Sequence, residues 1–307
     1  MKLVILLFVL VGLTSHAQQL AQYSQWSSNQ FALNPAHAGI KSCADLHTLY
    51  RIQWVGFEGA PRSGFFTLSV PLPAKRKQFL SARHGMGFKF ETDQIGQFST
   101  NRFNLAYAMH MNFNKNDRLS LGLYGGGVQM SYNPSTTETL NPDPSVMRQA
   151  NFLSPDASFG AWYNSTNFYL GLVFQNLIPT KWEEIGDNSR YRFHSNIYGG
   201  YRYEMNEKLT LLPALLLRIP PRGPISADLN VQVDYLNKVG FGLGFRNTDA
   251  LIAFVNFKFA EQFSVGYSFD FTLSKLQKVS QNTHEISLRF STCKSQKSST
   301  SACPMFE

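Results

Sequence analysis

Residues 103–113, Phe-Asn-Leu-Ala-Tyr-Ala-Met-His-Met-Asn-Phe, alternate large apolar side chains with small or polar ones. Successive side chains of a β-strand point to opposite faces, so this stretch predicts a strand with one apolar face and one small, polar face. The same period of two recurs at 227–235, 263–271 and 285–290. The chain is therefore expected to form a sheet whose two faces meet different surroundings.

Extending this search along the chain gives fourteen candidate strands. They span 45–54, 63–71, 84–92, 99–113, 118–132, 156–164, 166–176, 190–204, 208–218, 225–235, 239–246, 250–259, 262–272 and 283–292. No segment has a convincing helical period. The best short candidate for a helix is 143–151, which lies inside a predicted loop.

The composition narrows the class of protein. Only 16% of the 307 residues are charged, whereas soluble domains average about 25%. Aromatic residues reach 14%, which excludes a disordered chain, because disordered chains are rich in charge and poor in rings. Mean hydropathy is −0.20, which argues against a bundle of transmembrane helices.

The small, polar face of the strands decides between a soluble sheet and a membrane barrel. A solvated surface carries many Lys and Glu side chains, but this face carries few. It is rich in glycine instead, at Gly122, Gly126, Gly171, Gly200, Gly240, Gly242, Gly244 and Gly266. These faces predict an all-β fold, a transmembrane antiparallel β-barrel over 45–292, with apolar side chains toward lipid and small ones in the lumen.

The lengths of the connections give a second test. The connections at 114–117, 205–207 and 236–238 are short, whereas 133–155 and 177–189 are long and polar. Outer-membrane barrels have short periplasmic turns and longer outer loops. The alternation predicts an outer-membrane barrel with both termini in the periplasm. Two connections depart from it, since 72–83 is long for a turn and 247–249 is short for a loop.

Residues 1–17 have the order of a secretory signal peptide, with Lys2, an apolar stretch at 3–13 and small residues before a cut after Ala17. The apolar stretch is too short to span a bilayer. A buried N-terminal helix is the alternative. The sequence thus predicts an exported protein.

Residues 18–44 lack alternation and are rich in Gln, Asn and Ser, with rings at Tyr23, Trp26 and Phe31. Asn34-Pro35 favours an extended or turning backbone, because the residue before proline avoids the α region. We expect this segment to enter the glycine-lined lumen as a hatch. The alternative is a loose periplasmic lead.

Three cysteines in an exported chain leave one unpaired. Cys43 precedes the first strand and Cys293 follows the last, and these strands are neighbours in a closed barrel. A Cys43–Cys293 disulfide is therefore favoured. A Cys293–Cys303 bond within the tail, 293–307, and three reduced thiols are the alternatives.

Nothing in the sequence predicts catalysis, a cofactor or a metal site. The histidines are scattered, and neither a His-Glu-x-x-His nor a paired Cys-x-x-Cys motif occurs. Asp228, Asp234 and Asp270 are expected to meet luminal arginines as a polar interior. The basic charge balance, 28 Lys and Arg against 20 Asp and Glu, does not indicate a nucleic-acid partner in an outer-membrane protein. The basic run 75–77 is instead expected to be solvated, or to meet acidic periplasmic partners or lipid headgroups.

Several motifs in order resemble the PorP/SprF family of type IX secretion system outer-membrane proteins. They are Gln22-Tyr23-Ser24-Gln25, Asn34-Pro35-Ala36-His37-Ala38-Gly39, Gln53-Trp54-Val55-Gly56-Phe57-Glu58-Gly59-Ala60-Pro61, Asp93-Gln94-Ile95-Gly96, Leu119-Ser120-Leu121-Gly122, Tyr169-Leu170-Gly171-Leu172, Gly266-Tyr267-Ser268-Phe269-Asp270 and His284-Glu285-Ile286-Ser287-Leu288. The resemblance marks Asn34, Pro35, Ala36 and Gly39 as the family motif of the hatch. His37 departs from it, because the family usually has an aromatic residue there.

The resemblance implies a non-enzymatic barrel that supports export or surface attachment of a cargo adhesin, gliding adhesins among them. The implied partners are the cargo's C-terminal domain, the type IX translocon barrel, its shuttle protein and outer-membrane lipid. Loops 133–155, 177–189 and 219–224 are then the expected contacts. The family is also similar to FadL-type barrels, which makes a channel for hydrophobic small molecules the alternative function. That channel would need an apolar luminal pocket and a lateral gap.

Overall fold

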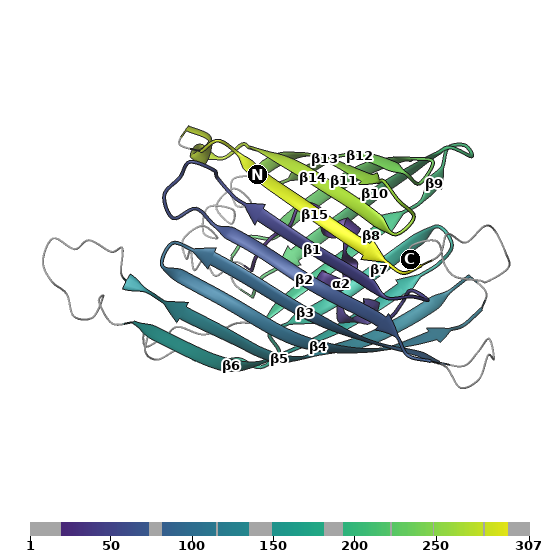
Figure 1. Cartoon of the computed structure of the whole chain (residues 1–307), viewed down its shortest axis with the longest axis horizontal. Coiled ribbons are helices and arrows are strands. Elements are labelled where there is room, and N and C mark those ends of the chain that lie inside the picture. Colours follow the sequence, from purple (N-terminus) through teal and green to yellow (C-terminus); the bar gives the residue numbers. More distant parts are fainter. Residues whose placement is uncertain are drawn as a thin grey trace, which may run out of the picture.

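The computed structural model describes residues 20–73, 82–114, 116–134, 149–180, 193–221, 223–247, 249–278 and 280–293. From residue 45 onward these residues form one antiparallel sheet that closes on itself (Figure 1). The first strand pairs with the last, and every other strand pairs with its neighbours in the sequence. The predicted signal peptide, the basic run 75–77 and Cys303 lie outside the described residues.

The wall has the fourteen strands that the sequence predicts, because β8 and β9 are one strand interrupted at Arg202 and both pair with β10. In order the strands are β1 (Asp45–Ile52), β2 (Arg62–Pro71), β3 (Arg83–Ile95), β4 (Phe98–Asn112), β5 (Arg118–Tyr132), β6 (Ala150–Asn164), β7 (Phe168–Gln175), β8 (His194–Tyr201), β9 (Tyr203–Glu204), β10 (Leu209–Ile219), β11 (Ser226–Tyr235), β12 (Val239–Arg246), β13 (Ala250–Lys258), β14 (Phe263–Thr272) and β15 (Thr283–Ser291).

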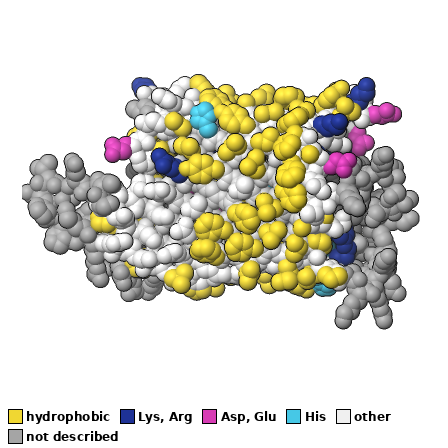
Figure 2. All heavy atoms as spheres, viewed as in Figure 1, with side chains coloured by type: hydrophobic (Ala, Val, Ile, Leu, Met, Phe, Trp, Pro, Cys, Tyr) yellow, Lys and Arg dark blue, Asp and Glu magenta, His cyan; other side chains and the backbone are white. Residues whose placement is uncertain are grey.

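The predicted orientation of the two strand faces is confirmed. On β4 the side chains of Phe103 and Leu105 are 45% and 65% exposed, whereas Asn104 and Ala106 are buried in the lumen. Apolar side chains cover the middle of the outer wall, and charged ones gather toward its two ends (Figure 2). This is the distribution that a bilayer requires of a barrel. No helix among the described residues is long and apolar enough to cross a membrane.

The start of β6 and the connection between β3 and β4 differ from the prediction by more than most strand boundaries. β6 begins at Ala150, within the stretch expected to be loop or helix, because Ala150 pairs with Tyr132 at the far end of β5. The remainder of the helix candidate, 143–148, lies outside the described residues. β3 and β4 are joined by only two residues, 96–97, since Gly96 adopts a left-handed backbone with φ of 56° that closes a tight turn.

The two ends of the barrel are different. The disulfide rim is the end that carries Cys43 and Cys293, and the loop rim is the opposite end. The short connections 113–117, 165–167, 236–238 and 259–262 lie at the disulfide rim. Residues 133, 134 and 149, next to β5 and β6, and the short helix η4 (Lys275–Lys278) lie at the loop rim.

Residues 20–44, the luminal segment, lie inside the barrel (Figure 1). Three short helices form there, η1 (Trp26–Ser28), α2 (Gln30–Leu33) and η2 (Pro35–His37), none of which the sequence predicted. Near its start the segment bonds to Glu285, close to the loop-rim end of β15, and it ends at Cys43 on the disulfide rim. It therefore runs along most of the bore.

Candidate functional site: the luminal segment and its vestibule

Asn34, the first residue of the family motif, is completely buried between the luminal segment and the wall. Its Nδ2 donates to the carbonyl of Ala161 on β6 and to the hydroxyl of Tyr198 on β8, both at 3.0 Å. Its Oδ1 accepts from the backbone N–H of Ala36 at 2.9 Å and so caps η2. Pro35 occupies the first position of that helix, where a missing N–H costs nothing.

Glycines in the wall let the motif approach the strands closely. A Cβ added at Gly122 on β5 would collide with the backbone of Pro35 and Ala36, and one at Gly160 on β6 would collide with the Asn34 side chain. Gly39 adopts a left-handed φ of 63° and lies against Gly85 on β3. The segment and the wall thus meet almost backbone to backbone, and glycine is needed on both sides.

His37 is held as a neutral, packed ring. It lies 4.5 Å from the Trp162 ring, and its Nε2 is 3.2 Å from the Tyr198 hydroxyl. Burial, with a smaller contribution from His110, lowers the pKa of His37 to about 3. The surrounding core fills this part of the lumen with Trp26, Ala36, Ile40, Trp162, Tyr169, Val173, Tyr198, Ala214 and Leu216.

Toward the loop rim the segment is bound by a buried charge cluster. The Glu285 carboxylate accepts the backbone N–H groups of Ser24 and Gln25, both at 2.9 Å. The Ser24 hydroxyl donates to Asp270 at 2.6 Å. Arg51 pairs with both carboxylates, at 2.8 Å to Asp270 and 3.3 Å to Glu285. This cluster joins the segment to β1, β14 and β15 at once.

A second charge cluster lies around Glu91 on β3, two strands from β1. Its carboxylate accepts from Lys89, Arg102 and the Tyr23 hydroxyl, each at 3.2 Å. Arg102 also pairs with Asp156 at 3.1 Å. Burial, followed by the charge of Glu91, raises the pKa of the Tyr23 hydroxyl, which therefore stays protonated as a donor.

The luminal carboxylates named from the sequence have different partners. Asp228 pairs with Arg246 at 3.0 Å, and Asp270 belongs to the loop-rim cluster. Asp234 accepts instead from Gln232 at 2.6 Å. Glu285 and Glu91, which bind the segment most directly, were missed. Their position on the small, polar face of a strand was the available signal.

The structure joins Cys43 to Cys293 by a disulfide, with the Cα atoms 5.1 Å apart. Cys43 ends the luminal segment and Cys293 follows the last strand. In the register of the adjoining strands, Asp45 of β1 lies opposite Ser291 of β15. The bond therefore spans the seam where the barrel closes.

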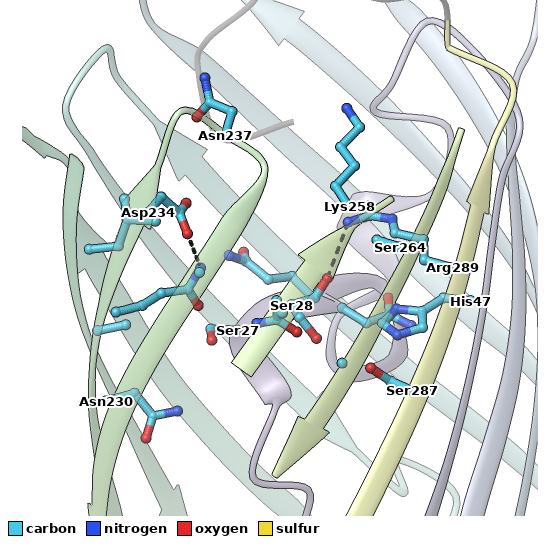
Figure 3. Close-up of a pocket in the computed structure, with 18 of the residues that line it drawn as sticks. Ser27, Ser28, His47, Asn230, Asp234, Asn237, Lys258, Ser264, Ser287 and Arg289 are labelled. Carbon is cyan, nitrogen blue, oxygen red and sulfur yellow. Dashed lines mark hydrogen bonds between the residues drawn. The ribbon is translucent and has the colours of Figure 1, made fainter. Parts of the chain in front are cut away.

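A cavity of about 600 Å³, the vestibule, lies between the luminal segment and the strands β10 to β15 and β1. Its floor is formed by residues 27–31, His37, Ile40 and Lys41 of the segment, and its mouth by Asn237, Lys238 and Lys258 at the disulfide rim. Figure 3 shows Asn237 and Lys258 at this mouth. Apolar side chains such as Leu212, Pro213 and Phe257 line much of the wall between floor and mouth, and serine, asparagine and glutamine side chains lie among them. These polar side chains are Ser69, Asn230, Gln232, Asn256, Ser264 and Ser287.

In the described part of the chain, some charged side chains of the vestibule have ion-pair partners, and others do not. Asp45 is saturated by Lys41 at 3.0 Å and Arg289 at 2.7 Å. Lys238 and Lys258 are exposed at the mouth, and neither has an ion-pair partner in the part of the chain that the structure describes. The unneutralised charge is therefore positive. No group of three or more His, Cys, Asp or Glu suited to a metal occurs among the described residues.

Solved structures share this fold at low sequence identity. The toluene transporter TbuX of Ralstonia pickettii aligns with a TM-score of 0.52 at 10% identity, over 88% of this chain and 93% of that one. A FadL homologue of Pseudomonas aeruginosa aligns with a TM-score of 0.48 at 12% identity, over 89% and 94%. The TbuX likeness shows the FadL-like barrel fold and nothing finer.

No curated protein sequence matches the chain. The family model described as type IX secretion system membrane protein PorP/SprF matches residues 15–290, nearly the whole chain, including the Asn34–Gly39 motif and all fourteen wall strands up to Phe290. The apolar outer wall accords with a membrane protein of this kind. The chain belongs to the PorP/SprF family of type IX secretion system outer-membrane barrels.

Proposed function

We propose that this barrel supports the export or surface attachment of a cargo adhesin by engaging the adhesin's C-terminal domain. The observation that carries the proposal is the filled lumen. The luminal segment is bonded to β1, β6, β8, β14 and β15, so the bore is occupied by the protein's own chain. A barrel filled in this way is suited to bind a partner, without enzymatic activity, and not to pass one through its centre.

In this proposal the disulfide rim faces the periplasm and the loop rim faces outward, because short turns are periplasmic in outer-membrane barrels. The C-terminal tail is then periplasmic, and the translocon barrel and shuttle protein are lateral partners in the lipid. Residues 24 and 25 lie near the loop rim, inside the bore. Of the contact loops named from the sequence, 133–155 and 177–189 lie largely outside the described residues, at 135–148 and 181–189. The third, 219–224, is described except for residue 222 and connects β10 to β11 at the loop rim.

A channel for hydrophobic solutes is less well supported. Such a channel needs an apolar path through the lumen. The vestibule has apolar lining residues, but the luminal segment closes it on one side, and the buried charges of the Glu285 cluster lie in the bore above it.

The proposal is tested by deleting the gene in its host and measuring, by surface labelling and mass spectrometry, every exported adhesin. We expect one adhesin or a small group to disappear from the surface and to return when the wild-type gene is restored. Normal display of all adhesins in the deletion strain would refute the proposal.

A further inference from the structure

The vestibule has the form of a blind binding site. The luminal segment closes it on one side, and Asn237 and Lys258 lie toward the disulfide rim (Figure 3). A volume of about 600 Å³ lies within the range of cavities that hold ligands of a few hundred daltons, about 300–1,000 Å³. A blind cavity of this size favours a single chain end over a hairpin, whose two strands must lie about 5 Å apart.

The wall of the vestibule presents hydrogen-bonding groups that are still free. Within the described ranges, no partner is recorded for the side chains of Asn237, Asn256 and Ser264, which all line the cavity. His47 is only 3% exposed, yet its Nδ1 has no partner among the described residues. Amide and hydroxyl side chains both donate and accept, as do the N–H and C=O groups of an extended peptide.

The unpaired charges of the vestibule determine which sign of charge a ligand should carry. Asp45 is neutralised by two cations. Asp234 is hydrogen-bonded only to the neutral amide of Gln232 among the described residues, and its negative charge is outweighed by Lys238 and Lys258. Lys238 and Lys258 come from adjacent turns and stand at the mouth. Two uncompensated ammonium groups attract carboxylates and speed the approach of an acidic ligand.

We propose that the vestibule binds the acidic, extended end of a polypeptide that enters from the disulfide rim. Its backbone bonds to the asparagine and serine side chains of the wall, and its carboxylates lie near Lys238 and Lys258. That this polypeptide is the secreted cargo rests on the proposed function. The binding of an acidic peptide to the vestibule does not depend on that proposed function.

Two octapeptides with an uncharged fluorophore at the N-terminus test the site. One is Gly-Ser-Gly-Ser-Glu-Asp-Glu-Asp with a free carboxylate, and its twin has Gln and Asn for the acidic residues and an amidated end. Binding to the full-length mature barrel in detergent is followed by fluorescence anisotropy at about 0.1 M salt, where charges act over about 10 Å. We expect the acidic peptide to bind at least about tenfold more tightly, a difference of about 1.4 kcal/mol.

Variants separate the vestibule from general surface charge. K238Q/K258Q is expected to weaken the acidic peptide about tenfold or more. The matched control K208Q removes an exposed lysine from the neighbouring turn outside the cavity, and it is expected to change the affinity less than about twofold. N256W, which fills the cavity without changing charge, is expected to abolish binding. Resistance of the folded barrel to SDS before heating verifies that each variant folds.

Equal binding of the two peptides, or unchanged binding by K238Q/K258Q, would overturn the inference. Loss of binding in K208Q equal to that in K238Q/K258Q would do the same, because it would assign the effect to the rim as a whole. These results are independent of adhesin display. Peptide binding with normal display in the deletion strain refutes only the secretion role, and lost display without peptide binding refutes only the vestibule site.

Discussion

At the scale of single residues, Asn34 ties the luminal segment to two strands and caps a helix with the same side chain. All three hydrogen bonds are buried or nearly so. Loss of the Asn34 side chain leaves the Ala161 carbonyl and the Tyr198 hydroxyl without this donor. Unsatisfied buried groups cost more stability than the loss of an exposed hydrogen bond.

Asn34→Ala is therefore expected to lower the free energy of unfolding by about 2 kcal/mol, the sum of a lost cap and unsatisfied buried groups. The measurement is guanidinium unfolding of the barrel in lipid vesicles, followed by tryptophan fluorescence. Asn116→Ala, at an exposed turn, is the matched control and should change stability little. Equal stability of the two variants would contradict the role given to Asn34.

His37 gives the segment a dependence on pH. Its pKa is about 3 when folded, and the ordinary value of about 6.5 applies when unfolded. Because the folded pKa is the lower one, stability from the neutral ring is complete above pH 6.5 and is lost as the pH falls toward 3.

Lowering the pH from 7 to 5 should cost about 2 kcal/mol through His37, at 1.36 kcal/mol for each pH unit below 6.5. The comparison of wild type with His37→Gln in the same unfolding assay isolates this share, since other histidines remain in both. An identical pH dependence of the two proteins would exclude His37 as the source.

The sequence pointed to residues 34–39 as a group through the family resemblance, but it gave no role to any one of them. Their roles depend on Gly122, Gly160 and Tyr198, which are far away in the sequence and reach the motif only after the barrel closes. Glu285 was missed for the same reason, because its partners are backbone groups of an irregular segment.

At the scale of elements, β5 brings two glycines with opposite surroundings into one strand. Gly122 faces the luminal segment at close range, whereas a Cβ at Gly125 would meet nothing within 4 Å. The strand therefore contains its own control for testing the contact between wall and segment.

Gly122→Val is expected to displace η2 from the wall and raise ion conductance through single barrels in a planar bilayer. The added methyl groups collide with backbone, which cannot move aside as a side chain would. Gly125→Val should leave conductance at the wild-type level. Similar conductance of both variants would show that the segment does not depend on this contact.

The strands themselves were predictable because the alternation of apolar and polar residues is visible within each short stretch of sequence. Contacts between distant residues are not. Of the fourteen, β5 and β12 have the predicted bounds, and most others differ by one or two residues. β6 differs most, since 150–155 contain Pro155 and no regular alternation. Pairing with β5 imposes the strand there, and among the described residues its first half makes ladder pairs only with β5.

At the scale of the whole molecule, the wall and the luminal segment differ in what holds them. Every wall strand is paired on both sides, although β6 pairs with β7 only over 159–164, whereas the segment depends on side-chain contacts with the wall. The wall should therefore fold without the segment.

Deletion of residues 18–42 is expected to leave a folded, SDS-resistant barrel with a large, steady increase in ion conductance and in leakage of small solutes. If the deleted barrel folds but stays closed, the segment is not the element that fills the path.

The disulfide acts at the same scale, because it bridges the two ends of the wall. Replacing both cysteines, C43S/C293S, should lower the temperature at which the barrel loses SDS resistance. The β1–β15 ladder already holds this seam, so the loss is expected at the low end of the usual 2–4 kcal/mol. Wild type treated with reductant should match the variant. A variant as heat-resistant as oxidised wild type would contradict this role.

The hydrogen bonds of Glu285 and Arg51 to Ser24 have a consequence for the assembly of the barrel. These two charged residues sit on β15 and β1, which become neighbours only in the final step of closure. A slip of one residue between those strands would turn one side chain out into hydrocarbon, since side chains alternate in direction. Ser24 and Gln25 therefore find their carboxylate acceptor only when β1 and β15 are correctly aligned, and a barrel closed in the wrong register would lack this acceptor.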